Sequence, residues 1–245
     1  MRAGRAWAAA TATTAPRAPA AWRENPYDEA LRDGRGPLFL RRVDGWLLPL
    51  DVERWCAAPD AADLSVLARC GDSVLDVGCG PGRLVAALAA RGHRALGIDV
   101  SPEAVARAER LGGLALCRSV FDRLPGEGRW NTVLLIDGNI GIGGDPTALL
   151  KRLAEVTCSG GSVIAECLEV DVDDRCEVRI DDGRGRTGAP FAWARVGAAA
   201  LYRHAEAAGW ARREQWSAGG RVFVELARRP RPRTPVRAVP MPVST

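Results

Sequence analysis

Short apolar runs alternate with amphipathic stretches through the middle of the chain, beginning at Ser73. The runs have the length of buried strands, and the stretches between them have the spacing of helices that cover a sheet. Strands are predicted for SVLDVG, RALGIDV, LALCRSV, TVLLID and SVIAECLEV, and helices for RLVAALAARG and ALLKRLAEVT. Strands that alternate with helices in this way predict a doubly wound α/β fold with a mainly parallel sheet.

The pattern changes after the fifth predicted strand. Two runs near the end, 211–216 and 221–227, flank a glycine-containing turn and predict an antiparallel hairpin. This hairpin completes a Rossmann-like, mainly parallel, seven-stranded sheet. Residues 171–194 form an insertion with two short predicted strands, 177–181 and 191–196, around a glycine-rich turn. The insertion either shapes a substrate site or is a passive surface flap.

The same pattern divides the chain into a leader, an N-terminal lid with short helices, a main domain and a tail. Their boundaries are 1–22, 23–70, 71–228 and 229–245. We expect the leader and the tail to be disordered, because Ala, Thr, Pro and Arg offer too little apolar surface to offset the entropy of ordering. In the lid, short helices are predicted after Asp51 and from Ala61.

Charge and cysteine content narrow the function classes. The net charge is +4, but eight arginines lie in residues 1–22 and 228–245, and the rest of the chain has more acidic than basic residues. We therefore expect no nucleic-acid partner, since the main domain has no net attraction for phosphates. Seven scattered cysteines without a Cys-x-x-Cys pair predict free thiols in the cytoplasm and no metal site. No apolar run approaches the ~20 residues of a membrane helix.

The strongest chemical signal is the run Asp76-Val77-Gly78-Cys79-Gly80-Pro81-Gly82, where the first strand passes into the first helix. Its spaced glycines remove side chains from the turn, so a ligand can contact backbone at the carboxyl edge of the sheet. Asp99 ends the second strand, close to the ~20-residue spacing expected of an acid that binds ribose hydroxyls. A dinucleotide fingerprint would need a small residue where Arg83 stands, which disfavours NAD(P).

Together these features resemble the cofactor site of class I S-adenosylmethionine-dependent methyltransferases, over roughly Asp72 to Val170. The resemblance implies S-adenosylmethionine as cofactor and 71–228 as the domain that binds it. It implies that Asp99 holds the ribose and that the methionyl part lies near Asp76, Gly78, Gly80 and Gly82. It also implies that the adenine contacts Val100, Ser119, Val120 and Phe121, with Asp122 as an alternative.

The fourth strand ends in a glycine-rich loop, where the family places the transferred methyl group. This loop lacks the Asn/Asp-Pro-Pro-aromatic motif of methyltransferases that act on adenine or glutamine amines, so we expect a small-molecule acceptor. Oxygen, nitrogen and carbon remain open as the accepting atom, with oxygen the first guess. A general base is optional, because oriented reactants alone can contribute ~7–11 kcal/mol. If the enzyme uses one, Asp137 is the first choice.

The predicted substrate residues come from the same loop and from the lid. Asn139 or Asp145 would orient the acceptor, and Gly141 would allow its close approach. Tyr27 would cover the site from the lid, with a packing role as the alternative. The prediction is a cytoplasmic S-adenosylmethionine-dependent methyltransferase with a small-molecule acceptor, by analogy in specialised metabolism. An NAD(P)-dependent oxidoreductase and a non-catalytic regulatory protein that binds S-adenosylmethionine are the alternatives, and the oligomeric state is unknown.

Overall fold

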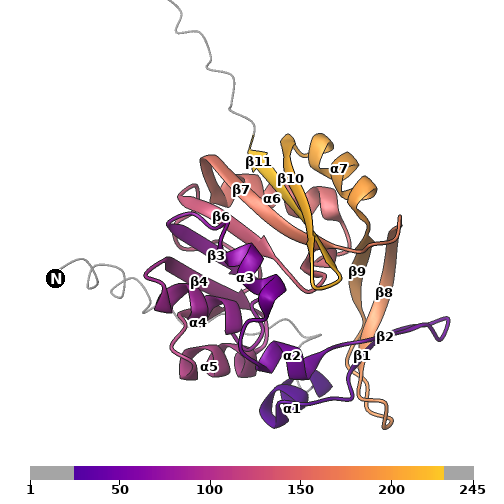
Figure 1. Ribbon diagram of the computed structural model, residues 1–245. Coiled ribbons are helices and arrows are strands. Elements are labelled where there is room, and N and C mark those ends of the chain that lie inside the picture. The colour runs from indigo at the N-terminus through magenta and orange to yellow at the C-terminus, as the bar shows by residue number, and fades with distance from the viewer. Residues whose placement is uncertain (1–24, 229–245) are drawn as a thin grey trace, which may run out of the picture.

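Two β-sheets organise residues 25–228, the part of the chain that the computed structural model describes (Figure 1). The predicted leader, 1–22, and tail, 229–245, lie outside these residues. The larger sheet has the strand order β10-β11-β7-β6-β3-β4-β5. Its strands are β3 (Ser73–Val77), β4 (Arg94–Asp99), β5 (Ala115–Cys117), β6 (Trp130–Leu135), β7 (Thr157–Cys167), β10 (Trp210–Ala218) and β11 (Arg221–Arg228).

Parallel pairing joins β5, β4, β3, β6 and β7, whereas β11 is antiparallel to both β7 and β10. The Rossmann-like, mainly parallel, seven-stranded sheet that ends in an antiparallel hairpin is therefore confirmed. The third strand is shorter than the predicted run, because pairing with β4 stops at Cys117.

Helices cover both faces of this sheet, as the alternation of side chains along each strand requires. On β6, Val133 and Leu135 pack in the core beneath α6 and α7, whereas Leu134 packs with α3 and α4. The helices are α3 (Ala61–Leu67), α4 (Arg83–Ala90), α5 (Pro102–Arg110), α6 (Pro146–Val156) and α7 (Ala198–Ala207). A short 3₁₀ turn, η3 (Asn139–Gly141), follows β6.

A second, four-stranded sheet with the order β2-β1-β8-β9 lies beside the large one (Figure 1). Its strands are β1 (Phe39–Arg42), β2 (Leu47–Pro49), β8 (Asp173–Asp181) and β9 (Phe191–Val196). Two helices of the lid, α1 (Pro26–Asp33) and α2 (Val52–Cys56), pack on it through a core that includes Leu31, Val52 and Ile180.

Only short helices were predicted in the lid, and the structure adds the hairpin β1–β2. Leu40 of β1 pairs with Leu48 of β2 and with Ile180 of β8, so the lid and the insertion form one antiparallel sheet. Three or four residues are too few to show a period-two pattern, and the partner strand lies far along the chain. The hairpin is therefore fixed by long-range pairing and not by local sequence.

Candidate active site

The loop from β3 into α4 lies at the carboxyl edge of the large sheet, where parallel α/β folds bind ligands. The backbone N–H groups of Gly78 and Cys79 both donate to the Ile98 carbonyl of β4, at 2.8 and 3.0 Å. Gly78, Gly80 and Gly82 have φ values of 71°, 53° and 88°, a region in which residues with a Cβ are strained. The alternate glycines thus allow the turn that the sequence pattern implied.

The three glycines differ in what surrounds them. A Cβ atom at position 80 would lie 3.5 Å from the Tyr27 hydroxyl oxygen, with no closer neighbour outside the adjoining residues. A Cβ at position 78 would lie 2.6 Å from Asn139 Nδ2, and one at position 82 would lie 2.4 Å from the Ala108 Cβ of α5. Gly80 therefore has room for a Cβ in ordinary contact with Tyr27, Gly78 makes room for Asn139, and Gly82 permits close packing of α4 on α5.

Asp99 lies at the end of β4, beside the glycine loop. Its Oδ2 accepts from the Gly80 N–H and its Oδ1 from the Ser101 N–H, both at 2.9 Å. Burial raises the pKa of Asp99 to about 6, although these N–H donors favour its charged form. The Ser101 hydroxyl in turn donates to the Asp28 carboxylate of α1, so the lid is connected to Asp99 through one side chain.

A cavity of about 300 Å³ opens between the two sheets and is bounded by this loop. We name its two regions the loop end and the small-sheet end. The predicted residues at the loop end are Gly78, Gly80, Asp99, Val100, Ser119, Val120 and Phe121. The open backbone at Gly80 and the buried acid Asp99 fit a ligand with a ribose ring, because ribose hydroxyls are donors that a carboxylate accepts.

The small-sheet end of the cavity is lined by apolar and aromatic side chains. Leu40, Leu50 and Ile180 contribute aliphatic groups. Two edge-to-face ring pairs complete the wall: Phe191 with Trp193, at a centroid distance of 6.1 Å, and Tyr27 with Trp55, at 6.2 Å, where the Tyr27 hydroxyl reaches toward Gly80 of the loop end. The sequence analysis found only Tyr27 among these residues. The strand predicted at 191–196 was a signal for Trp193, but nothing local indicated Leu40 or Leu50.

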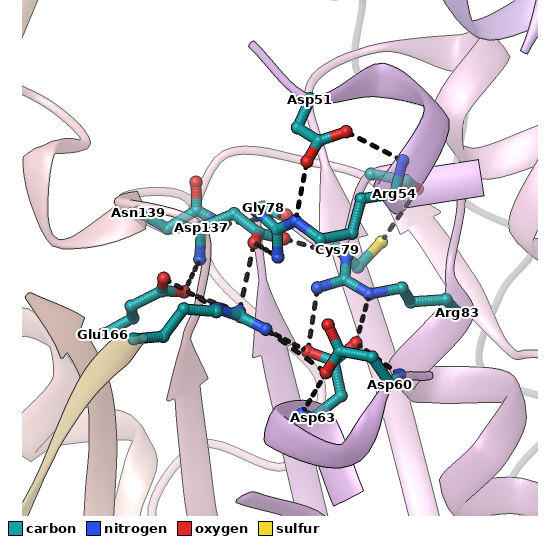
Figure 2. Close-up of polar contacts among 12 residues, drawn as sticks. Asp51, Arg54, Asp60, Asp63, Gly78, Cys79, Arg83, Asp137, Asn139 and Glu166 are labelled. Atoms are coloured by element: carbon teal, nitrogen blue, oxygen red, sulfur yellow. Dashed lines mark hydrogen bonds and ion pairs between the residues drawn. The ribbon is translucent and has the colours of Figure 1, made fainter. Parts of the chain in front are cut away.

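Asp137, the predicted base, lies on the cavity wall among three arginines (Figure 2). Its carboxylate is 2.8 Å from Nη1 of Arg54, 2.8 Å from Nη1 of Arg83 and 3.2 Å from Nη2 of Arg221. Its backbone, at a φ of 59°, donates to the Glu166 carboxylate at 2.7 Å. The Asp137 carboxylate is therefore already bound by protein side chains.

The arginines around Asp137 belong to a larger buried ion-pair cluster. Arg83 also binds Asp63 through Nε at 2.8 Å, and both side chains are at most 4% exposed. Arg221 binds Asp63 at 2.8 Å and Glu166 at 2.7 Å. Burial opposes the charge of Asp63, but the two guanidinium groups prevail and lower its pKa to about 2. The cluster fixes the loop after β6 against α3, α4 and the strands β7 and β11.

Asn139 lines the cavity and holds the glycine loop in place (Figure 2). Its Nδ2 donates to the carbonyls of Val77 and Gly78, both at 2.9 Å. The amide therefore satisfies backbone acceptors at the end of β3 that the sheet leaves open.

Five of the predicted site residues lie away from the cavity wall. Gly82 packs against α5, and Gly141 packs against β9, where a Cβ would lie 2.2 Å from the Ala194 carbonyl oxygen. Asp122 accepts from the Ser119 N–H at 3.2 Å. Asp145 caps α6 by accepting from the Ala148 N–H and pairs with Arg175 at 3.4 Å.

Asp76 is the fifth of these residues and is 3% exposed. Burial raises its pKa to about 7, opposed by the charge of Arg83. Asp76 would therefore affect a ligand only indirectly, through the glycine loop that follows it.

Comparison with known proteins agrees with this geometry. Residues 74–161 match the family model for a methyltransferase domain. The fold resembles an S-adenosylmethionine-dependent methyltransferase from Bacteroides fragilis, solved with S-adenosyl-L-homocysteine. The TM-score is 0.71 at 20% identity, over 85% of this chain and 95% of that one.

Two further solved structures have lower scores. One is 1,6-didemethyltoxoflavin-N1-methyltransferase from Burkholderia thailandensis, with a TM-score of 0.50 at 20% identity over 69% of this chain and 78% of that one. The other is a sugar N-methyltransferase from Streptoalloteichus, with a TM-score of 0.51 at 18% identity over 69% and 85%. At such identities the likeness shows a shared fold.

The strand order, the glycine loop and the acid at the end of β4 define a class I methyltransferase fold. Residues 74–161 match a methyltransferase domain, and the fold around them is shared with a solved S-adenosylmethionine-dependent methyltransferase. Within residues 25–228, no helix has the length and apolar character needed to cross a membrane.

Proposed function

We propose that this enzyme transfers a methyl group from S-adenosylmethionine to a small-molecule acceptor held in the same cavity. The observation that carries the proposal is the continuity of that cavity, in which the glycine loop and Asp99 line one end and the small sheet lines the other. Solved methyltransferases that act on a didemethyltoxoflavin and on a sugar share this fold, which supports an acceptor of small size.

In this proposal the loop end binds the cofactor. The Asp99 carboxylate accepts hydrogen bonds from the ribose hydroxyls, and the backbone at Gly78 and Gly80 borders the methionyl part. Val100, Ser119, Val120 and Phe121 surround the adenine. Asp76 and Gly82 support the loop from behind, since neither lines the cavity. The cofactor supplies a methyl group on a sulfonium, which is already a good electrophile.

The remaining catalytic contribution of the chain is alignment of the acceptor. Asp137 stays the candidate base, but its carboxylate is already held by three guanidinium groups. Asn139 fixes the glycine loop through two carbonyls, so its role is to position the loop. We therefore assign the larger part of the rate enhancement to orientation, which can contribute ~7–11 kcal/mol.

We also propose a cytoplasmic location and no nucleic-acid substrate. The seven cysteines are all free thiols, as expected of a protein in a reducing compartment. The two basic ends lie outside the described residues, and the cavity wall itself is largely apolar.

Isothermal titration calorimetry with S-adenosylmethionine, S-adenosylhomocysteine and NAD(P) tests the cofactor assignment. Binding of the first two without the dinucleotides is expected, and the reverse preference would support an oxidoreductase. Incubation with methyl-labelled S-adenosylmethionine and a library of small molecules tests turnover. Cofactor binding without label transfer to any acceptor would support the regulatory alternative.

A further inference from the structure

We propose that the acceptor is an uncharged aromatic molecule of one or two rings, bound at the small-sheet end of the cavity. This inference rests on the proposed function, because it names the acceptor class for the same transfer. It follows from the charge, the shape and the rigidity of the wall that the small sheet and the lid helices provide.

The charge of that wall is the first argument. Among the described residues, the lid and the small sheet contribute no charged side chain to the cavity wall: they provide the aliphatic Leu40, Leu50 and Ile180, Ala192 and the two ring pairs. Burial of a charged group against such a surface removes it from water without providing a partner, which is costly. The wall therefore selects for an acceptor that is neutral where it contacts the small sheet.

The charged residues elsewhere on the cavity wall already have partners. Arg83 binds Asp63 and Asp137, and Arg118 donates to the Arg123 carbonyl at 2.8 Å. Asp99 accepts from two backbone N–H groups and faces the loop end. A charged acceptor would have to displace one of these interactions to obtain a counter-charge.

The shape of the wall is the second argument. The Tyr27–Trp55 pair comes from the lid helices and the Phe191–Trp193 pair from β9, so rings reach the cavity from two separate elements. Aromatic groups favour edge-to-face and offset contacts with further rings, beyond the burial of apolar area. Because the cavity of about 300 Å³ must also hold part of the cofactor, the acceptor is limited to one or two rings.

The rigidity of Trp193 is the third argument. An isolated β-bridge joins Trp193 to Ile142 of the loop after β6. A Cβ at position 141 would lie 2.7 Å from Cε2 of the Trp193 ring, so the indole packs directly on the loop backbone. The ring is therefore held in advance beside the loop where the family places the transferred methyl, which reduces the entropy cost of binding.

Calorimetry on the full chain saturated with S-adenosylhomocysteine provides the test. Three probes of similar size separate the effect of charge from the effect of aromaticity: 2-naphthol is planar and neutral, 2-naphthoate is planar and charged, and 2-decalol is neutral and saturated. We expect 2-naphthol to bind at least ~tenfold more tightly than each of the others, a difference that affinity measurements resolve easily. Equal affinity for the naphthoate or the decalol, or no binding of any probe, would overturn the proposed acceptor class.

A matched pair of lysine variants tests whether the preference for the neutral probe arises at the small-sheet end. Leu50→Lys places a cation at the small-sheet end, so 2-naphthoate should gain at least ~fivefold in affinity relative to 2-naphthol. Leu47→Lys makes the same change on β2, where Leu47 is 47% exposed and does not line the cavity, and should change neither affinity. If Leu50→Lys binds S-adenosylhomocysteine but keeps the wild-type preference for 2-naphthol over 2-naphthoate, the acceptor does not bind beside Leu50. If Leu50→Lys fails to fold, the comparison of the three probes on the wild-type protein still tests the acceptor class.

The two proposals fail in different ways. If S-adenosylhomocysteine does not bind the wild-type protein, the proposed function is wrong. If it binds and the probes show no preference for the neutral planar molecule, only the acceptor class is wrong.

Discussion

The two ends of the cavity are built from the chain in different ways. The loop end comes from residues between Val77 and Phe121, and in the proposed function it binds the cofactor through backbone groups and a single buried acid. The small-sheet end uses side chains from the lid and from the insertion, which meet only because β1 pairs with β8. The contrast indicates that cofactor binding is encoded locally, whereas the choice of acceptor depends on long-range pairing.

The largest expected effect comes from removing the ion pairs that support both ends. Asp63→Asn removes the most deeply buried counter-charge of Arg83 and Arg221, and breaking a buried pair costs about 3–5 kcal/mol. Urea unfolding measures the loss. The matched variant Asp44→Asn breaks an exposed pair with Arg42 and should cost less than ~1 kcal/mol.

Asp63 also determines how the free energy of unfolding changes at acidic pH. Because the pKa of Asp63 is lowered to about 2 in the folded protein, its stabilising contribution is complete at neutral pH. It is lost as the pH falls from about 4, the ordinary value, through about 2. Asp63→Asn should therefore show a flatter stability profile in this range, and equal slopes for the two proteins would contradict the role of the cluster.

Two glycine variants separate folding from binding at the loop end. Gly82→Ala combines a left-handed φ with overlap on Ala108, so a loss of about 2–5 kcal/mol in unfolding free energy is expected. Gly80→Ala bears only the backbone strain, about 1–2 kcal/mol, because its Cβ would make an ordinary contact with Tyr27 without overlap. That Cβ should instead weaken S-adenosylhomocysteine binding at least ~tenfold. Equal stability losses for the two variants would contradict the distinction between them.

Asp99→Asn tests the buried acid. Loss of the charged acceptor should weaken S-adenosylhomocysteine binding by ~1–3 kcal/mol at pH 7.5, as measured by calorimetry. Because the pKa of Asp99 is about 6 and the carboxylate is the better acceptor, wild-type affinity should fall as the pH drops through about 6. The variant should lack this pH dependence, and a parallel decline in both proteins would assign the titration to another group.

Asp28→Asn should have the smallest effect. The amide can still accept from Ser101, but the charge that helps to raise the pKa of Asp99 is gone. The midpoint of the pH profile for S-adenosylhomocysteine should move to lower pH by less than ~1 unit. Asp33→Asn, an exposed change on the same helix, should leave the midpoint in place.

The sequence was sufficient for the large sheet because each strand and helix there has its own local pattern, as in the runs that became β3 and β6. The loop end followed from the spaced glycines, which act through backbone geometry, and from Asp99, whose carboxylate accepts from the Gly80 N–H. The partners of Asp137 could not be predicted, since Arg54 and Arg221 approach it from opposite ends of the chain. Gly82 and Gly141 were predicted at the site but lie away from the cavity wall, where they make room for neighbouring elements. A glycine pattern alone does not distinguish such room from room for a ligand.

The contact between the loop after β6 and β9 leaves no space for side chains. Cβ atoms at Gly141 and Gly144 would lie 2.2 Å from the Ala194 carbonyl oxygen and 2.7 Å from the Ala192 Cβ. The insertion and this loop are consequently one interlocking part, and grafting the insertion from a relative would bring bulkier residues into collision with the recipient loop. Transplanting both pieces together is therefore the route to a chimera with a new selectivity. We expect exchange of the exposed hairpin turn at 184–187 alone to cost only the ion pair between Arg186 and Glu29.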